Sequence, residues 1–140
     1  MMEYAKKNDI HGILELDKHI NEEILLKKIQ AKEVYVIRKD RIIIGTLRYS
    51  LFWDNLPFIN MLYIKEIHQN KGLGSSMVIF WENEMKKLKY NSVMTSTQSN
   101  ENAQHFFRKH GYIDVGGLVL HNEALEIILF KKLGLTTAST

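Results

Sequence analysis

Cysteine is absent from this sequence, which excludes a disulfide framework, a thiol nucleophile and a cysteine-based zinc site. Proline occurs once and no stretch is of low complexity, so no linker divides the chain. We therefore expect a single domain over residues 1–140, a length sufficient for one hydrophobic core.

A strong charge of one sign and a long apolar run are also missing. The formal net charge is only +3 and the basic residues are scattered, whereas nucleic-acid-binding domains gather them on one face. No apolar run is long enough to span a bilayer, and the first residues lack the apolar core of a signal peptide. These features predict a cytoplasmic protein without nucleic-acid or membrane partners.

The composition is that of a globular protein, with 45% hydrophobic and 25% charged residues. Runs rich in β-branched and aromatic residues alternate with segments of helical periodicity. The predicted strands lie near residues 3–5, 34–37, 42–52, 58–64, 93–96, 118–120 and 124–130, the last two after a break at Gly116-Gly117. The predicted helices begin at Asn8 or Asp9, at Asn21, at Gly74 and near Ala103. This order predicts one layered sheet with helices on its faces.

The third predicted helix has the clearest pattern. Its apolar residues recur at helical spacing and are expected to face the core: Leu73, Met77, Trp81, Met85 and Leu88. Glu82 and Lys86 stand four residues apart, so we expect them to form an exposed pair that supports the helix. The strand at 58–64 is apolar on both faces and is expected to be central.

A glycine loop, Gly72-Leu73-Gly74, lies between that strand and the third helix. A strand, a glycine loop and a helix in this order aim free backbone N–H groups at an anion. Glycine lets a phosphate approach the main chain closely, and Lys71 could pair with it. The loop is not a Walker A loop, because no lysine precedes Ser75. It is not a dinucleotide-binding fingerprint either, because Met77 replaces the third glycine.

Two motifs together carry a family resemblance. Gln69-x-x-Gly72-x-Gly74 resembles the pyrophosphate loop of the Gcn5-related N-acetyltransferase (GNAT) family. A later segment, Asn100-x-x-Ala103-x-x-Phe106-Phe107-x-Lys109-x-Gly111-Tyr112, resembles the family's later helix. The resemblance implies a single α/β (mixed α+β) domain, with a mostly antiparallel sheet of six to seven strands, about four helices and splayed central strands.

The resemblance also implies a site for acetyl-CoA as cosubstrate. Pantetheine would bond to the backbone of the fourth strand, where an N–H would polarise the thioester carbonyl. The pyrophosphate would lie on the loop amides. Asn100 would contact the pantetheine arm of CoA, and Phe107 would face the CoA sulfur. The implied binding residues are Leu62, Tyr63, Ile64, Gln69, Asn70, Lys71, Gly72, Leu73, Gly74, Ser75, Asn100 and Phe107. The implied reaction is direct transfer of acetyl to a primary amine, with a small molecule as the acceptor and a homodimer left open.

The sequence departs from the family pattern where protons are handled. Asn60 stands at the usual base position and cannot take a proton, and Phe107 stands at the usual acid position. Two alternatives remain open: water relays the base step and the thiolate leaves unaided, or a neighbour substitutes. The candidate substitutes are Tyr63 and Tyr112, with His68 and His105 also within consideration. A catalytically degenerate acyl-CoA sensor is the alternative function.

The remaining polar residues give weaker signals. The six histidines show no metal-ligand spacing, so we expect no metal site. Arg48, Tyr49, Trp53 and Asp54 lie on or after the long third strand, which the resemblance places near the acceptor. They predict either an acceptor pocket with one charged contact or an ordinary sheet face with an exposed edge.

Overall fold

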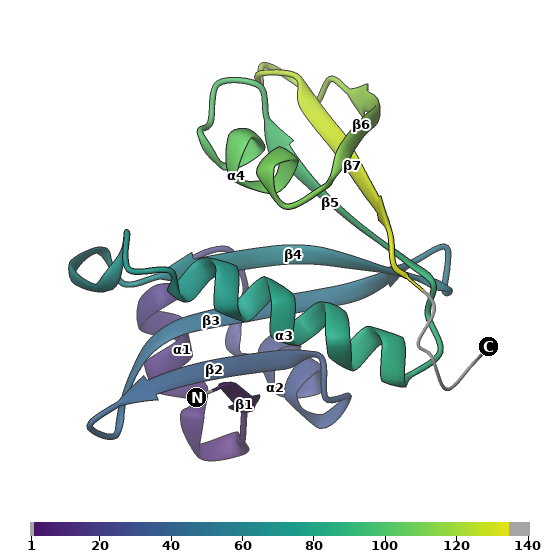
Figure 1. The fold of residues 1–140 in the computed structure, drawn as a ribbon. Helices are drawn as coiled ribbons and strands as arrows, with labels where there is room; N and C mark the ends of the chain where they lie inside the picture. Colours follow the sequence, from purple (N-terminus) through teal and green to yellow (C-terminus); the bar gives the residue numbers. More distant parts are fainter. Residues whose placement is uncertain (1, 135–140) are drawn as a thin grey trace. The chain divides into compact units, whose positions relative to one another are not determined.

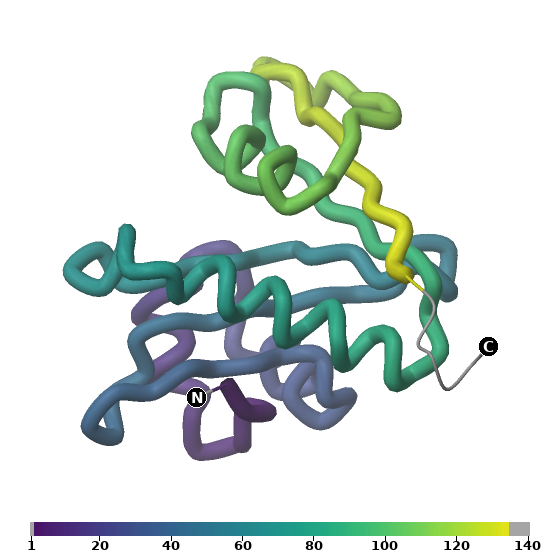
Figure 2. Tube along the Cα trace, viewed as in Figure 1, coloured from purple at the N-terminus to yellow at the C-terminus, as the bar shows by residue number. Residues whose placement is uncertain are grey.

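A computed structural model describes residues 2–134 of the chain, shown as a ribbon in Figure 1 and as a Cα tube in Figure 2. Its elements are β1 (Met2–Tyr4), the 3-10 turn η1 (Lys7–Asp9), α1 (Ile10–Leu16), α2 (Glu22–Gln30), β2 (Val34–Lys39), β3 (Ile42–Phe52), β4 (Leu56–Ile64), the 3-10 turn η2 (Glu66–His68), α3 (Leu73–Lys87), β5 (Ser92–Gln98), α4 (Ala103–Lys109), β6 (Ile113–Leu118) and β7 (Glu126–Lys132).

The strands hydrogen-bond in the order β1-β2-β3-β4-β5-β7-β6. β4 and β5 are parallel, whereas β1 with β2, β2 with β3, β5 with β7, and β6 with β7 are antiparallel. This confirms the predicted fold class, a mixed and mostly antiparallel sheet with four α-helices and a central fourth strand. The chain divides into two compact units: unit 1 holds residues 2–50 and 60–80, and unit 2 holds residues 51–59 and 81–134.

In unit 1 the helices pack on both faces of the strands. Successive residues of a strand point to opposite faces. Val34 and Val36 of β2 belong to the core formed with α1 and α2. Ile37 lies on the opposite face, beside Gly45 of β3, and there it meets the side of α3 that carries Met77.

Gly45 is required at that crossing. A Cβ at this position would lie 2.7 Å from side-chain atoms of both Ile37 and Ile64 and 3.3 Å from the sulfur of Met77. Because Gly45 has no side chain, the first half of α3 and the end of β4 lie closer to β3 than a larger residue at position 45 would permit. The backbone N–H of Lys65 donates to the carbonyl of Ile44 over 2.7 Å. These contacts hold in place the end of β4, from which the glycine loop departs.

The predicted start of α2 is confirmed. The side chain of Asn21 accepts a hydrogen bond from the N–H of Ile24 over 2.8 Å. Glu22 and Glu23 occupy the first turn, where the helix dipole favours acids.

In unit 2, β5 and β7 pair along their whole length, from Ser92 opposite Lys132 to Gln98 opposite Glu126. Val93 of β5 and Leu129 of β7 are fully buried. Gly111, with φ of +91°, ends α4 in the left-handed conformation, as its position in the sequence predicts.

The last strands differ from prediction. β6 is continuous from Ile113 to Leu118 and passes through Gly116 and Gly117, where a break was expected. The register with β7 holds these glycines in the ladder and shifts only between Asp114 and Gly116. The strand expected at residues 118–120 is therefore wrong in its bounds, because pairing with β7 begins earlier and stops at Leu118.

The prediction for the third helix is correct for the middle of its buried face and wrong at its end and in one pair. Leu73 is half-buried, and Leu88 is 53% exposed and follows the end of α3 at Lys87. Met77, Trp81 and Met85 are fully buried, as their spacing predicts. Glu82, however, does not form an exposed pair with Lys86. It is 6% exposed and accepts hydrogen bonds from two residues of distant strands and loops.

Candidate functional site

The end of β4 leads into the glycine loop. Pro57, Ile59 and Ile64 are buried, so side chains on both faces of the strand are covered, as expected for a central strand. Leu62 is half-buried and Tyr63 is 37% exposed, so part of the strand's end lies at the surface.

The glycine loop continues directly from this strand. The side-chain amide of Gln69 donates to the carbonyl of Ile64 over 2.7 Å, and the backbone N–H of Gln69 donates to Glu66 over 3.1 Å. Gln69 therefore fixes the loop and has no backbone N–H left for a ligand. Asn70 and Gly72 are left-handed, with φ of +63° and +81°. Such curled loops form concave nests of N–H groups that bind anions.

The loop opens onto free space at the start of α3. A Cβ built on Gly72 would meet no atom within 4 Å. Helix α3 begins at Leu73, so the N–H groups of Leu73 and Gly74 belong to its first turn, where the helix has no carbonyl to offer them. The dipole of this long helix adds positive potential at the same end. The segment from Asn70 to Ser75 thus has the backbone chemistry of a phosphate site.

Three lysines of unit 1 act on His68, two residues before Asn70. Slight desolvation, and then the charges of Lys39, Lys71 and Lys65, hold the pKa of His68 below its ordinary value. Three ammonium groups therefore lie near enough to His68 to act on it. Lys39 ends β2 and Lys65 follows β4, so residues far apart in sequence contribute to one positive region. Of these three lysines, only Lys71 could be predicted from the sequence, because Lys39 and Lys65 belong to no motif.

The second set of predicted residues lies in unit 2, around α4. Asn100 is exposed in the turn before the helix. Phe107 is 4% exposed, and its ring packs edge-on against the rings of Phe106 at 5.1 Å and Tyr112 at 5.2 Å between centroids. The structure therefore brings Phe107 and Tyr112 together within unit 2, whereas Leu62 through Ser75 are brought together in unit 1.

Tyr112 has a buried partner. Its hydroxyl donates to Glu82 over 2.8 Å, and the second oxygen of Glu82 accepts from Lys131 over 2.8 Å. The Lys131 ammonium also lies 5.7 Å from the centre of the Tyr112 ring. Burial, and then the charge and the hydrogen bond of Glu82, raise the pKa of Tyr112 far above its ordinary value. Tyr112 therefore holds its proton firmly, which is the opposite of what an acid catalyst requires.

Asn60, at the expected base position, and Thr95 of β5 are also engaged in hydrogen bonds. Asn60 is exposed, and its amide donates to the hydroxyl of Ser50 over 2.8 Å. Thr95 donates to the carbonyl of Ile59 over 3.1 Å. Thr97, two residues further along β5, is 4% exposed, and its hydroxyl has no partner within residues 2–134. A buried hydroxyl without a partner is costly, so a ligand that supplied one would be favoured there.

The residues near the expected acceptor side fall into different environments. Arg48 donates to Asp17 over 2.9 Å, and both side chains are largely buried, so the charge of Arg48 is already neutralised. Trp53 is 80% exposed at the turn between β3 and β4, where Trp53 and Asp54 both have positive φ. The ring of Trp53 lies 4.7 Å from that of Phe52.

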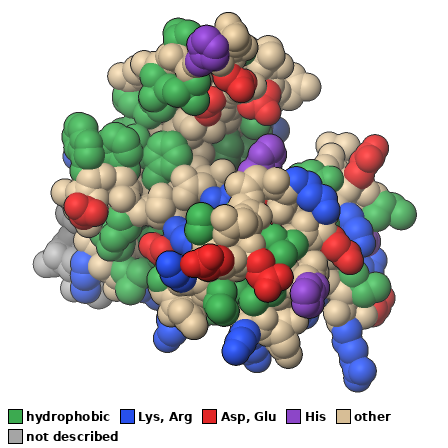
Figure 3. All heavy atoms as spheres, turned by 180° about the vertical axis from the view of Figure 1, so that it is seen from behind, with side chains coloured by type: hydrophobic (Ala, Val, Ile, Leu, Met, Phe, Trp, Pro, Cys, Tyr) green, Lys and Arg blue, Asp and Glu red, His purple; other side chains and the backbone are tan. Residues whose placement is uncertain are grey.

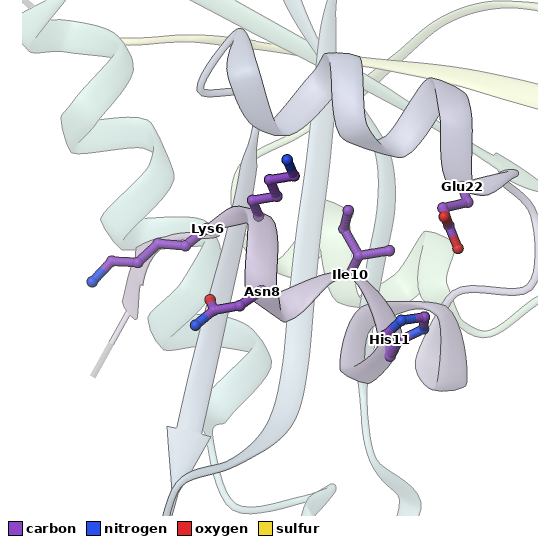
Figure 4. A pocket seen from close by; sticks show the side chains of 6 residues that line it. Lys6, Asn8, Ile10, His11 and Glu22 are labelled. Atoms are coloured by element: carbon purple, nitrogen blue, oxygen red, sulfur yellow. The ribbon is translucent and has the colours of Figure 1, made fainter.

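A surface pocket of about 710 Å³ lies elsewhere in unit 1, around η1 and the starts of α1 and α2. Its lining residues are Lys6, Lys7, Asn8, Ile10, His11 and Glu22. Figure 4 shows that Lys6 and Asn8 extend to one side of Ile10 and that His11 and Glu22 lie on the other. These polar groups do not converge on one point, and none belongs to the glycine loop.

Within residues 2–134, no helix is both long and apolar enough to cross a bilayer, and no group of three or more metal-ligating side chains is placed to hold an ion. On the face drawn in Figure 3, acidic and basic side chains are interspersed rather than gathered by sign.

Comparison with known proteins decides the family. The model of the family described as "Acetyltransferase (GNAT) family" matches residues 2–112. The chain belongs to the GNAT acetyltransferase family. The motifs from Gln69 to Gly74 and from Asn100 to Tyr112 both fall within the matched region. No curated protein matches the sequence.

Solved GNAT-type structures share the fold at low sequence identity. Ard1 from Thermoplasma volcanium is 12% identical with a TM-score of 0.85, over 95% of this chain and 97% of its own. A GNAT-family acetyltransferase from Bacillus cereus is 22% identical with a TM-score of 0.78, over 95% and 96%. N-acetylglutamate synthase from Neisseria gonorrhoeae, complexed with coenzyme A and N-acetyl-glutamate, is 17% identical with a TM-score of 0.82, over 96% of this chain and 35% of its own.

Proposed function

We propose that this chain is an acetyl-CoA-dependent N-acetyltransferase that passes an acetyl group directly to a primary amine of a small molecule. The observation that carries the proposal is the left-handed loop at the start of α3. The charges of Lys39, Lys65 and Lys71, which act on His68 just before the loop, support it. Family membership and the coenzyme A complex of the Neisseria relative support the same cosubstrate. A cytoplasmic location belongs to this proposal, as does association of two copies, which an open strand edge in unit 2 supports.

The residues present fit acetyl-CoA. In the proposal, the amides from Asn70 to Ser75 bind the pyrophosphate, and the three lysines attract the phosphate charges. The backbone of Leu62 to Ile64 holds the pantetheine and acetyl end, at the part of β4 where Leu62 is half-buried and Tyr63 is 37% exposed. Asn100, in the turn before α4, and Phe107, in α4, stay predicted contacts of the pantetheine arm.

Acetyl-CoA supplies an acetyl group activated as a thioester. The amine must arrive neutral, and Asn60 cannot take its proton, so in the proposal the proton passes to water. An N–H at the end of β4 stabilises the charge that develops on the carbonyl oxygen. Of the two tyrosines considered as acids, Tyr63 is the better candidate because its side chain is 37% exposed, whereas Tyr112 is 2% exposed and already bonded to Glu82.

Release of free CoA across a panel of amines tests the proposal, with polyamines, amino acids, aminoglycosides and peptides as acceptors. We expect turnover with at least one small amine, and replacement of Tyr63 by phenylalanine should lower the rate without changing acetyl-CoA affinity. Calorimetric binding of CoA without turnover on any amine would instead indicate the degenerate acyl-CoA sensor, which the missing carboxylate and tyrosine would then explain.

The lysines near the loop give an independent test of the binding site. Lys71→Gln should weaken CoA binding and reduce its dependence on salt, since one phosphate contact is lost. Lys18→Gln makes the same change of charge at an exposed residue outside the loop and should leave affinity unchanged. Equal effects of the two substitutions would show that only the net charge matters.

A further inference from the structure

Strand β6 forms an open edge of the sheet. Among residues 2–134 it pairs only with β7, and all six of its residues are exposed. Ile113 is 61%, Val115 52% and Leu118 44% exposed, and the chain continues through Val119 at 75% and Leu120 at 52%. An edge strand presents unpaired N–H and C=O groups, and here large apolar side chains accompany them.

This edge has little of the usual protection against pairing. Proteins guard exposed edges with lysine, proline, inward-pointing charge or β-bulges. The charged residue of β6 is Asp114, and both of its carboxylate oxygens accept hydrogen bonds from Arg108 over 2.9 Å. Residues 115–120 carry no charge and no proline, and a Cβ on Gly116 would meet nothing within 4 Å. The register shift at Val115 is the edge's one irregularity, and the ladder resumes at Gly116.

The sequence after β6 favours a strand that the chain alone does not form. Leu118, Val119 and Leu120 read as a strand from their composition. In the structure β6 ends at Leu118, and the next two residues lie exposed outside any strand. This apolar segment is continuous with an open strand edge. Such a segment can pair with a strand of another chain.

We propose that a second copy of this chain covers this edge, so that residues 113–120 pair antiparallel with their own counterparts across a two-fold axis. An antiparallel edge is self-complementary, and a two-fold interface requires that property. The uncharged run from Val115 to Leu120 meets an equally uncharged run, so the pairing brings no like charges together despite the net charge of +3. A foreign partner would have to supply a matching uncharged apolar strand.

The size of the edge sets the strength of the dimer. Stable interfaces use about 20–30 residues on each side, and residues 113–120 are far fewer. We therefore expect an association that depends on concentration, with Kd on the order of micromolar or weaker. The proposed function already includes association of two copies, and this interface rests on it. The test of the dimer needs neither acetyl-CoA nor an amine, so the dimer and the acetyltransferase activity can fail separately.

Sedimentation velocity on the full chain, from about 1 to about 100 µM, tests the interface. The wild type should pass from monomer to dimer across this range, and Val115→Lys should remain monomeric. Ile79→Lys is the matched control, because Ile79 on α3 is 51% exposed against 52% for Val115, and it should dimerise like the wild type. Unchanged thermal unfolding would show that Val115→Lys folds.

Hydrogen exchange supplies a second measurement that does not depend on the variant. Amides of residues 116–120 should become protected as protein concentration rises. A wild type that stays monomeric would overturn the proposal. So would a Val115→Lys dimer of wild-type affinity, or concentration-dependent protection confined to other segments.

Discussion

Replacement of Glu82 by alanine should destabilise the protein more than most single substitutions do. Glu82 is 6% exposed, and its two oxygens accept hydrogen bonds from Tyr112 and Lys131, each over 2.8 Å. Without the carboxylate, the Tyr112 hydroxyl is left buried with no acceptor, which costs about 1–3 kcal/mol. The side chain of Lys131 is 26% exposed and can turn toward water, so its share of the loss is smaller.

The summed effect should be about 3 kcal/mol, the lower end of the range for breaking a buried ion pair. For a chain of this size that corresponds to a fall in Tm of roughly 10 °C. Tyr112→Phe should cost less, about 1–1.5 kcal/mol, because it removes the hydroxyl together with its need for an acceptor. Urea unfolding of both single variants and of the double variant measures the coupling, which should exceed about 1 kcal/mol.

Glu84→Ala is the matched control. Glu84 lies on the same helix and pairs with Lys87, whose side chain is 76% exposed, so its loss should cost at most about 1 kcal/mol. The reasoning is refuted if Glu82→Ala and Glu84→Ala destabilise equally, or if the effects of Glu82→Ala and Tyr112→Phe simply add.

Three further predictions follow from single residues. Folding raises the pKa of Tyr112, so the stability that this residue contributes is complete below the ordinary tyrosine pKa near 10 and is lost as pH rises above it. In urea unfolding, the free energy of Tyr112→Phe should therefore decline less at alkaline pH than that of the wild type. Burial raises the pKa of Asp9, but hydrogen bonds from Arg38 and the Lys6 backbone outweigh it and leave the pKa lowered, so stability should fall below pH about 4 and Asp9→Asn should flatten that fall. Phe107→Tyr adds a hydroxyl to a ring that is 4% exposed, so the Tm of the variant should fall below that of the wild type without ligand. If the ring faces the thioester, saturating acetyl-CoA should restore the wild-type Tm. A difference in Tm that acetyl-CoA leaves unchanged would place Phe107 in the core alone.

Much of the fold could be predicted because local patterns determine it. The spacing of Met77, Trp81 and Met85 identified the buried side of α3, and the side chain of Asn21 caps α2 as its position suggests. Glu82 could not be predicted to be buried, because its partners lie 30 and 49 residues away in sequence. Helical spacing gives the direction of a side chain and says nothing of which distant groups meet it.

The candidate site was predictable to the same degree. The glycine motif gave the position of the loop, because the spacing of its glycines reflects a backbone requirement. The left-handed conformation of Asn70 and the nearness of Lys39 and Lys65 depend on tertiary structure and carry no motif. The unpartnered hydroxyl of Thr97 was likewise invisible, since threonine in a strand is ordinary.

The most direct test of the central claim is the calorimetric affinity of CoA for the wild type and for Gly72→Val. Gly72 has φ of +81° and open space beyond it, so valine distorts the loop without meeting another atom of the fold. Gly116→Val, also at a glycine with open space, serves as control because Gly116 lacks positive φ and lies in β6. The account predicts that Gly72→Val binds CoA at least about tenfold more weakly, roughly 1.4 kcal/mol, while Gly116→Val binds normally. A folded Gly72→Val protein with wild-type affinity for CoA would contradict it.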